Sequence, residues 1–161
     1  MIQRVHHQFG PYVQKDSKIL ILGSFPSVKS REASFYYGHP QNRFWKVISC
    51  IFQDNLPVSV EQKKTLLSTH QIALWDVIES CDIKGSSDAS IRNVIPTNLE
   101  ELLKEIPIQK ILINGKTAYH YYLKYHQDLD VPAICMPSTS PANAAWSLTQ
   151  LIDVYEKELK V

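Results

Sequence analysis

Four short apolar segments of the chain have the pattern of buried β-strands. They are Lys18–Leu22, Gln71–Trp75, Lys110–Ile113 and Val131–Met136. The first and third are apolar at successive positions, which is typical of strands buried on both faces of a parallel sheet. Pro132 indicates that the fourth lies at a sheet edge or at a strand start, because proline cannot donate a ladder hydrogen bond.

Segments with helical spacing of apolar residues lie between and after these strands. They are Asn42–Phe52, Ser59–Ser68, Asn98–Ile106, Lys116–Tyr125 and Ala144–Leu159. The third begins with a capping asparagine followed by acidic residues, as helix starts prefer. This alternation predicts an α/β fold, a three-layer α/β/α sandwich with a central, mainly parallel four-stranded sheet. The length of 161 residues fits a single domain spanning residues 1–161.

Composition and charge exclude several classes of protein. With 17 Lys and Arg against 16 Asp and Glu, the formal charge is +1, so the chain lacks the strongly basic balance of many nucleic-acid-binding proteins. A local positive face remains compatible with that total. The three widely spaced cysteines form no disulfide framework or zinc motif, and the histidines show no metal-ligand spacing. We find no secretory signal and no apolar run that could span a membrane, and therefore expect a cytoplasmic protein without a metal.

Polar or turn-forming residues follow each predicted strand. They are the segment GSFPS at 23–27, Asp76-Val77, Asn114-Gly115 and the segment PSTSPAN at 137–143. In open α/β sheets, ligands bind beyond the carboxyl ends of the strands. We therefore expect these four segments to converge on one site. None of them carries a phosphate-loop or dinucleotide-binding glycine pattern.

Each candidate residue has a functional and a purely structural interpretation. Tyr37 offers a ring for stacking on a flat ligand, whereas Asn42 is either functional or a helix cap. The Asn114 amide is able to read a nucleobase edge but also fits an Asn-Gly turn, and Asp76 is either a hydrogen-bond acceptor or a turn cap. We expect His39 to be a hydrogen-bonded turn residue, and the other histidines to be surface or satisfied core residues. The hydroxyls of PSTSPAN, placed before the last helix, fit a phosphate site or an ordinary capping loop.

Together these segments resemble the uracil-DNA glycosylase superfamily. GHPQNRFWKVI at 38–48 is similar to a stretch of the mismatch-specific uracil/thymine glycosylases, and INGKTAY at 113–119 is similar to their strand-to-helix segment. GSFPS and MPSTSPAN stand where the superfamily has its first and second motifs. Phe25 stands where relatives place a catalytic Asn or Asp, and Met136 where the second motif begins with His or Asn. The combination is most similar to the hypoxanthine-DNA glycosylase (DNA-deoxyinosine glycosylase) branch.

This resemblance implies a monofunctional repair enzyme that flips a deaminated base, hypoxanthine, out of DNA and hydrolyses its N-glycosidic bond. It implies catalytic roles for Asn42, which would hold the attacking water, and for Asn114. The implied base-binding residues are Gly23, Ser24, Phe25, Tyr37 and Asp76. The implied DNA-binding residues are Ser138, Thr139, Ser140 and Asn143. The resemblance further implies DNA containing a deaminated base as the partner, no cofactor, and a monomer at the nucleoid. A mismatch-specific uracil/thymine glycosylase and a catalytically silent DNA-binding homologue remain alternatives.

Overall fold

A four-stranded parallel sheet forms the centre of the protein, whose structure is a computed structural model that describes residues 1–160. Its strand order is β3-β2-β6-β7. The strands are β2 (Ile19–Gly23), β3 (Ile72–Asp76), β6 (Lys110–Asn114) and β7 (Ala133–Met136). All four predicted strands are thereby confirmed, within two residues at either end. β7 lies at the edge and directly follows Pro132, as the proline predicts.

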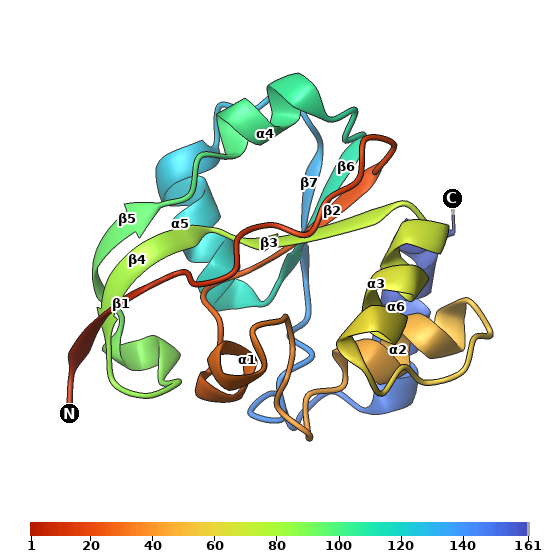
Figure 1. The fold of residues 1–161 in the computed structure, drawn as a ribbon, viewed down its shortest axis with the longest axis horizontal. Helices are drawn as coiled ribbons and strands as arrows, with labels where there is room; N and C mark the ends of the chain where they lie inside the picture. The colour runs from red at the N-terminus through yellow and green to blue at the C-terminus, as the bar shows by residue number, and fades with distance from the viewer. Residues whose placement is uncertain (161) are drawn as a thin grey trace.

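Helices cover both faces of this sheet, so the α/β/α arrangement is confirmed (Figure 1). The helices α2 (Phe44–Ile51), α3 (Val60–Thr69) and α6 (Leu148–Leu159) gather on one side. The other side is covered by α4 (Leu99–Glu105) and α5 (Lys116–His126). The Asn98 side chain caps α4 by accepting from the Glu101 N–H, as expected from the sequence.

One predicted helix start is wrong, and a second differs by two residues. α6 begins at Leu148 and not near Ala144, because Ser147 and Gln150 form a reciprocal capping box that fixes the first turn. The PSTSPAN loop is therefore not at the N-terminus of α6, and the helix-terminus argument for a phosphate site there fails. α2 begins at Phe44, after Asn42, whose Oδ1 accepts a hydrogen bond from the Phe44 N–H at 2.9 Å.

The structure has a second sheet, three-stranded and antiparallel, which the sequence patterns did not predict. Its order is β1-β4-β5, formed by β1 (Gln3–His6), β4 (Ile78–Ile83) and β5 (Arg92–Pro96). β4 follows β3 with only Val77 between them and curves away from the parallel sheet (Figure 1). A short helix, α1 (Val28–Ala33), and a 3₁₀ turn, Asp88–Ser90, complete the described elements.

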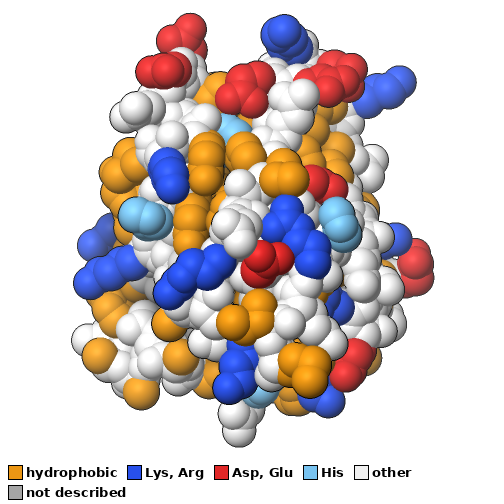
Figure 2. All heavy atoms as spheres, turned by 90° about the vertical axis from the view of Figure 1, so that its left-hand side faces the viewer, with side chains coloured by type: hydrophobic (Ala, Val, Ile, Leu, Met, Phe, Trp, Pro, Cys, Tyr) orange, Lys and Arg blue, Asp and Glu red, His pale blue; other side chains and the backbone are white. Residues whose placement is uncertain are grey.

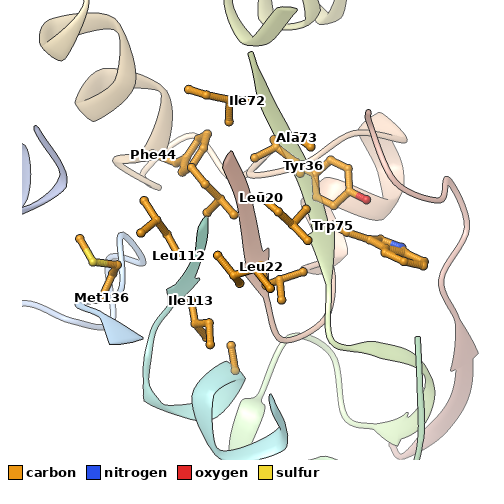
Figure 3. Close-up of a cluster of buried hydrophobic side chains, with 14 of the residues drawn as sticks. Leu20, Leu22, Tyr36, Phe44, Ile72, Ala73, Trp75, Leu112, Ile113 and Met136 are labelled. Atoms are coloured by element: carbon orange, nitrogen blue, oxygen red, sulfur yellow. The ribbon is translucent and has the colours of Figure 1, made fainter. Parts of the chain in front are cut away.

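Side chains of the parallel strands form the core together with residues from the covering segments. Figure 3 shows buried side chains on both faces of the sheet. Leu20 and Leu22 of β2 point to one face, and Leu112 of β6 and Phe44 of α2 lie on the other. All four are fully buried or nearly so. Each such aliphatic side chain stabilises the fold by about 1.5–3 kcal/mol through burial. This core fixes the strand ends from which the candidate residues project.

The surface charge is unevenly distributed although the total is near zero. On the face shown in Figure 2, Lys and Arg side chains occur from the upper edge to the bottom among apolar ones, and acidic side chains are densest at the upper edge with a few in the middle and at the right. Among residues 1–160, no helix combines the length and apolar character that a membrane crossing requires.

Candidate active site

A cavity of about 340 Å³ lies at the carboxyl ends of β2, β3 and β6. This volume falls in the range of small-molecule sites. Ten of the predicted site residues line it: Gly23, Ser24, Phe25, Tyr37, Asn42, Asp76, Asn114, Ser138, Thr139 and Ser140. Asn143 is not among the lining residues. The four segments expected to converge therefore do so.

Thr139 joins the two candidate amides, which come from distant parts of the chain. Its hydroxyl donates to Asn42 Oδ1 at 2.8 Å and accepts from Asn114 Nδ2 at 3.1 Å. The Thr139 backbone N–H donates to Asn114 Oδ1 at 3.0 Å. The predicted meeting of Asn42 and Asn114 at one cavity is thus confirmed, with Thr139 between them.

The same network fixes which way each amide points. Backbone N–H groups only donate, so the oxygens of Asn42 and Asn114 are the atoms that face Phe44 N and Thr139 N. Asn42 Oδ1 then accepts two hydrogen bonds, one from Phe44 N and one from the Thr139 hydroxyl. The remaining polar group of Asn42 is its NH₂, a donor. Asn42 therefore lies one residue before the N-cap Arg43, bonds the first N–H of α2 and lines the cavity, and its functional role stays a prediction.

Thr139 is fully buried, and its polar atoms are engaged within the protein. The Thr139 hydroxyl therefore bonds both amides within the protein and does not face solvent, and a DNA contact of Thr139 stays an untested prediction. The residue sets the positions of Asn42 and Asn114. The sequence predicted that this loop lies at the site, but it could not show that Thr139 points inward while its neighbours stay partly exposed.

Arg43 holds the loop that carries Thr139. Its guanidinium donates to the carbonyl oxygens of Ser140 at 2.9 Å and Asn143 at 3.1 Å, and also to that of Trp146. Its Nε reaches the Thr139 carbonyl at 3.4 Å, and its backbone N–H donates to the same oxygen at 3.1 Å. Because a guanidinium presents five donors in a rigid fork, one side chain secures most of the loop. Asn143 braces the loop from within, since its Nδ2 donates to the Ser138 carbonyl at 3.0 Å.

Two glycines allow this close approach of strands and loop. A Cβ at Gly23 would lie 2.6 Å from Asp76 Oδ1, so a larger residue there would displace the carboxylate. Gly115 has a φ of +101°, and a Cβ there would lie 3.1 Å from the Ser138 Cβ. Asn114-Gly115 therefore forms the predicted turn, and Asn114 also lines the cavity. Glycine is required at 115 because it adopts this φ freely and leaves room for the loop.

Tyr37 and Asp76 lie together beside Gly23. The Tyr37 ring stacks on Phe44 with a centroid distance of 4.0 Å and an interplanar angle of 16°, so one of its faces is already covered. Burial, with the Asp76 charge adding to it, raises the pKa of Tyr37 far above its ordinary value; the nearby Asn114 amide opposes the shift without reaching hydrogen-bond geometry. The Tyr37 hydroxyl therefore keeps its proton. Whether the uncovered face stacks on a base stays a prediction.

Three residues of the site region were not identified from the sequence: Arg43, His7 and Asp88. His7 pairs with Asp76, with 2.7 Å between Nε2 and Oδ2, and its side chain is only 1% exposed. Asp88 lines the cavity and accepts from the Ser24 hydroxyl at 3.3 Å. Partial burial of the Asp88 carboxyl, with the Asp76 charge adding to it, raises its pKa. His39 accepts from the Gln41 N–H through Nδ1, so its prediction as a hydrogen-bonded turn residue is confirmed.

The sequence pattern that defines the Uracil DNA glycosylase superfamily matches residues 10–160. The chain belongs to this superfamily. A hypoxanthine DNA glycosylase from Methanosarcina acetivorans is 31% identical over 141 residues, covering 86% of this chain and 89% of that protein. One from Methanosarcina barkeri is 32% identical over 116 residues, covering 70% and 73%.

A solved structure from the superfamily has the same fold. The solution NMR structure of a candidate uracil DNA glycosylase from Methanosarcina acetivorans superimposes with a TM-score of 0.81. It is 29% identical in sequence, and the match covers 100% of both chains. The family resemblance and the fold expected from the sequence are therefore confirmed. Among the described residues, no group of three or more His, Cys, Asp or Glu side chains is arranged to hold a metal ion.

Proposed function

We propose that this protein is a monofunctional DNA glycosylase that removes hypoxanthine from DNA containing deoxyinosine. Superfamily membership supports the reaction class, and two relatives named as hypoxanthine DNA glycosylases support the base. The observation that carries the proposal is the junction of Asn42 and Asn114 through Thr139 at the wall of one cavity. The substrate base must leave the duplex to reach such a cavity, and a deaminated base pairs poorly, which lowers the cost of flipping.

The reaction breaks the bond between the base and the anomeric carbon of deoxyribose. Positive charge develops on the sugar and negative charge on the departing base, so fixed dipoles that match these charges lower the barrier. Water adds to the sugar, and a proton ends on the released base, which leaves hypoxanthine and an abasic site. The backbone N–H groups of residues 23–25 are suited to stabilise the departing base.

Asn42 holds the attacking water in this proposal. Because its Oδ1 already accepts two hydrogen bonds, Asn42 approaches the water through its NH₂ donor. A donor positions the water oxygen but takes no proton from it, so the proton leaves after attack has begun. An oxocarbenium-like transition state tolerates such a weak nucleophile. Asn114 reads the base edge from the opposite side of the Thr139 hydroxyl.

DNA is the partner in this account, and the loop at 137–143 inserts beside the flipped nucleotide. Ser138, Ser140 and Asn143 remain its candidate DNA contacts, since each keeps some accessible surface. We further propose that the enzyme acts as a monomer in the cytoplasm, at the nucleoid, without a cofactor. Size-exclusion chromatography with light scattering tests the monomer.

The test is base release from matched oligonucleotides carrying one deoxyinosine or one deoxyuridine, followed by alkaline strand cleavage. Hypoxanthine release by the wild-type protein, lost in Asn42→Ala and Asn114→Ala variants that keep their melting temperature, supports the proposal. Release of uracil alone favours the mismatch-specific alternative, which is kept because the solved relative is described as a candidate uracil enzyme. DNA binding with no release of either base favours a silent homologue, as Phe25 in the first motif would allow.

A further inference from the structure

His7 and Asp76 form a buried pair directly behind the cavity wall. His7 follows β1 of the antiparallel sheet, and Asp76 is the last residue of β3 in the parallel sheet. Their Nε2 and Oδ2 atoms are 2.7 Å apart, and the two side chains are 1% and 4% exposed. The pair therefore joins the two sheets at the site. Neither the superfamily match nor the mechanism above gives His7 a role.

The geometry determines the tautomer of His7. An acceptor oxygen of Asp76 faces Nε2, so Nε2 carries the hydrogen. Nδ1 is buried with no hydrogen-bond partner among residues 1–160. The other tautomer would bury an unpaired Nδ1–H and set the Nε2 lone pair against Asp76 Oδ2. Leaving only the Nδ1 lone pair without a partner costs less free energy. His7 is thus a donor to Asp76.

The imidazole is held in this orientation by aromatic neighbours. Its ring lies edge-on to Phe9 at 4.9 Å and to Phe25 at 6.2 Å, and Tyr36 is 5.9 Å away. Asp76 is fixed through its main chain as well, because its carbonyl accepts from the Thr97 hydroxyl at 2.8 Å. Rotating either side chain would require repacking of buried residues.

The second carboxylate oxygen of Asp76 is left for the cavity. Oδ1 lies beside Gly23, where a Cβ would come within 2.6 Å, and no donor from residues 1–160 bonds it. His7 Nδ1 is fully buried without a partner, whereas Asp76 Oδ1 is not among such atoms and belongs to a residue that lines the cavity. A nearly buried carboxylate oxygen without a donor is costly, and a ligand N–H in the cavity would supply the missing hydrogen bond.

We propose that Asp76 Oδ1, held in place by His7, is the acceptor that selects a base bearing a lactam N–H, and that His7 is its positioning residue. This proposal rests on the function proposed above and adds a reason for rejecting adenine. Hypoxanthine presents N1–H, a donor, whereas adenine presents a lone pair at the same ring position. In the same pose, adenine would set that lone pair against the Asp76 oxygen, which leaves two acceptors unpaired beside a carboxylate that is only 4% exposed. Guanine also carries N1–H, so the acceptor distinguishes hypoxanthine from adenine specifically.

The sharpest test inverts the hydrogen-bonding polarity with Asp76→Asn. The His7 Nε2–H would hold the new amide oxygen, so the NH₂ group would face the cavity as a donor. We expect hypoxanthine recognition to fall about ten- to hundredfold, as expected for the loss of a hydrogen bond to a charged group. The ratio of adenine to hypoxanthine recognition rises at least tenfold. Selectivity unchanged from the wild type would overturn the proposal.

The positioning role of His7 is tested by two substitutions. His7→Gln retains a donor toward Asp76 and is expected to keep most of the selectivity, whereas His7→Leu removes the donor and loses it. Equal selectivity in the two variants would contradict the role. His126→Leu is the matched control, because His126 is also buried and paired with a carboxylate, Glu100, yet does not line the cavity. It is expected to lower the melting temperature without changing the preference between bases.

Two readouts separate this proposal from the proposed function. The first is base release from oligonucleotides carrying deoxyinosine, deoxynebularine (which lacks both N1–H and O6) or deoxyadenosine opposite the same base. The second is binding of free hypoxanthine and free adenine, followed by NMR chemical shifts of the protein. If the wild type releases no base but binds hypoxanthine over adenine, and Asp76→Asn reverses this order, the glycosylase proposal fails and the lactam proposal stands. If hypoxanthine is released but Asp76→Asn keeps the wild-type order in both readouts, only the lactam proposal fails.

Discussion

Replacing Thr139 with valine is the most informative test of the amide network. Valine has nearly the shape of threonine but lacks the hydroxyl, so Asn42 loses one donor and Asn114 Nδ2 loses its acceptor. Asn42 Oδ1 keeps the Phe44 N–H, and Asn114 Oδ1 keeps the Thr139 N–H. The substitution therefore removes the link between the amides without removing either amide.

The magnitude follows from full burial of Thr139. Loss of the hydrogen bond to Asn42 costs about 1 kcal/mol, and the orphaned Asn114 donor costs about 1–2 kcal/mol more. We expect the free energy of unfolding to fall by about 2–3 kcal/mol. Displacement of the amides by a fraction of an ångström to about 1 Å is expected to slow base release by about ten- to hundredfold.

Single-turnover base release from a deoxyinosine duplex, measured together with urea unfolding, checks both numbers. Thr139→Ser is the control, because it keeps the hydroxyl and loses only a buried methyl, at a cost of about 1 kcal/mol. Its rate is expected to stay near that of the wild type. A folded Thr139→Val variant with an undiminished rate would refute the view that Thr139 positions the amides for catalysis.

Three further predictions concern the surroundings of the site. Arg43→Lys leaves most of the loop carbonyls without their donor, so we expect faster amide hydrogen exchange across 139–146 and at least a tenfold lower release rate; unchanged exchange would argue against the bracing role. Gly115→Ala is expected to lower the free energy of unfolding by more than 1 kcal/mol in chemical denaturation, because of its positive φ and the contact with Ser138, whereas Gly85→Ala, with a positive φ but open space around it, is expected to lower it less. Because the pKa of Asp88 is raised in the folded protein, the folded state holds the carboxyl proton more tightly than the unfolded state does. The protonated carboxyl therefore favours folding at low pH, and this part of the free energy of unfolding is lost as the pH rises through the raised pKa. The melting temperature of Asp88→Asn, relative to that of the wild type, should therefore rise as the pH goes from acidic to neutral. A difference in melting temperature that stays constant with pH would contradict the raised pKa.

Local patterns were sufficient to predict the parallel sheet and the position of the site. Lys18–Leu22 and Lys110–Ile113 are continuous apolar runs ended by polar or turn residues, and both properties are readable within a few positions. Since the carboxyl ends of parallel strands meet at one edge, the residues after each run had to converge there. Asn114 was found in this way and Asn42 through the resemblance of the segment 38–48, whereas their link through Thr139 was not predicted.

The features that were missed depend on contacts between residues far apart in the chain. β1 pairs with β4 across more than 70 residues, and its exposed, mostly polar pattern differs little from that of a loop. His7 meets Asp76 only because that pairing forms, and it has no spacing by which a sequence motif would reveal it. Arg43 looked like one more charged residue beside an apolar helix, since its acceptors are main-chain carbonyls that no side-chain pattern encodes.

The central claim is that the Asn42 amide, oriented by Thr139 and Phe44, directs water at the deoxyribose during hypoxanthine release. Its most direct test is the single-turnover rate of release from a duplex containing one deoxyinosine, with the free base identified by mass spectrometry, for the wild type and for Asn42→Ala. We predict hypoxanthine as the product and a rate at least about 100-fold lower in the variant. Release by folded Asn42→Ala at the wild-type rate would contradict the claim.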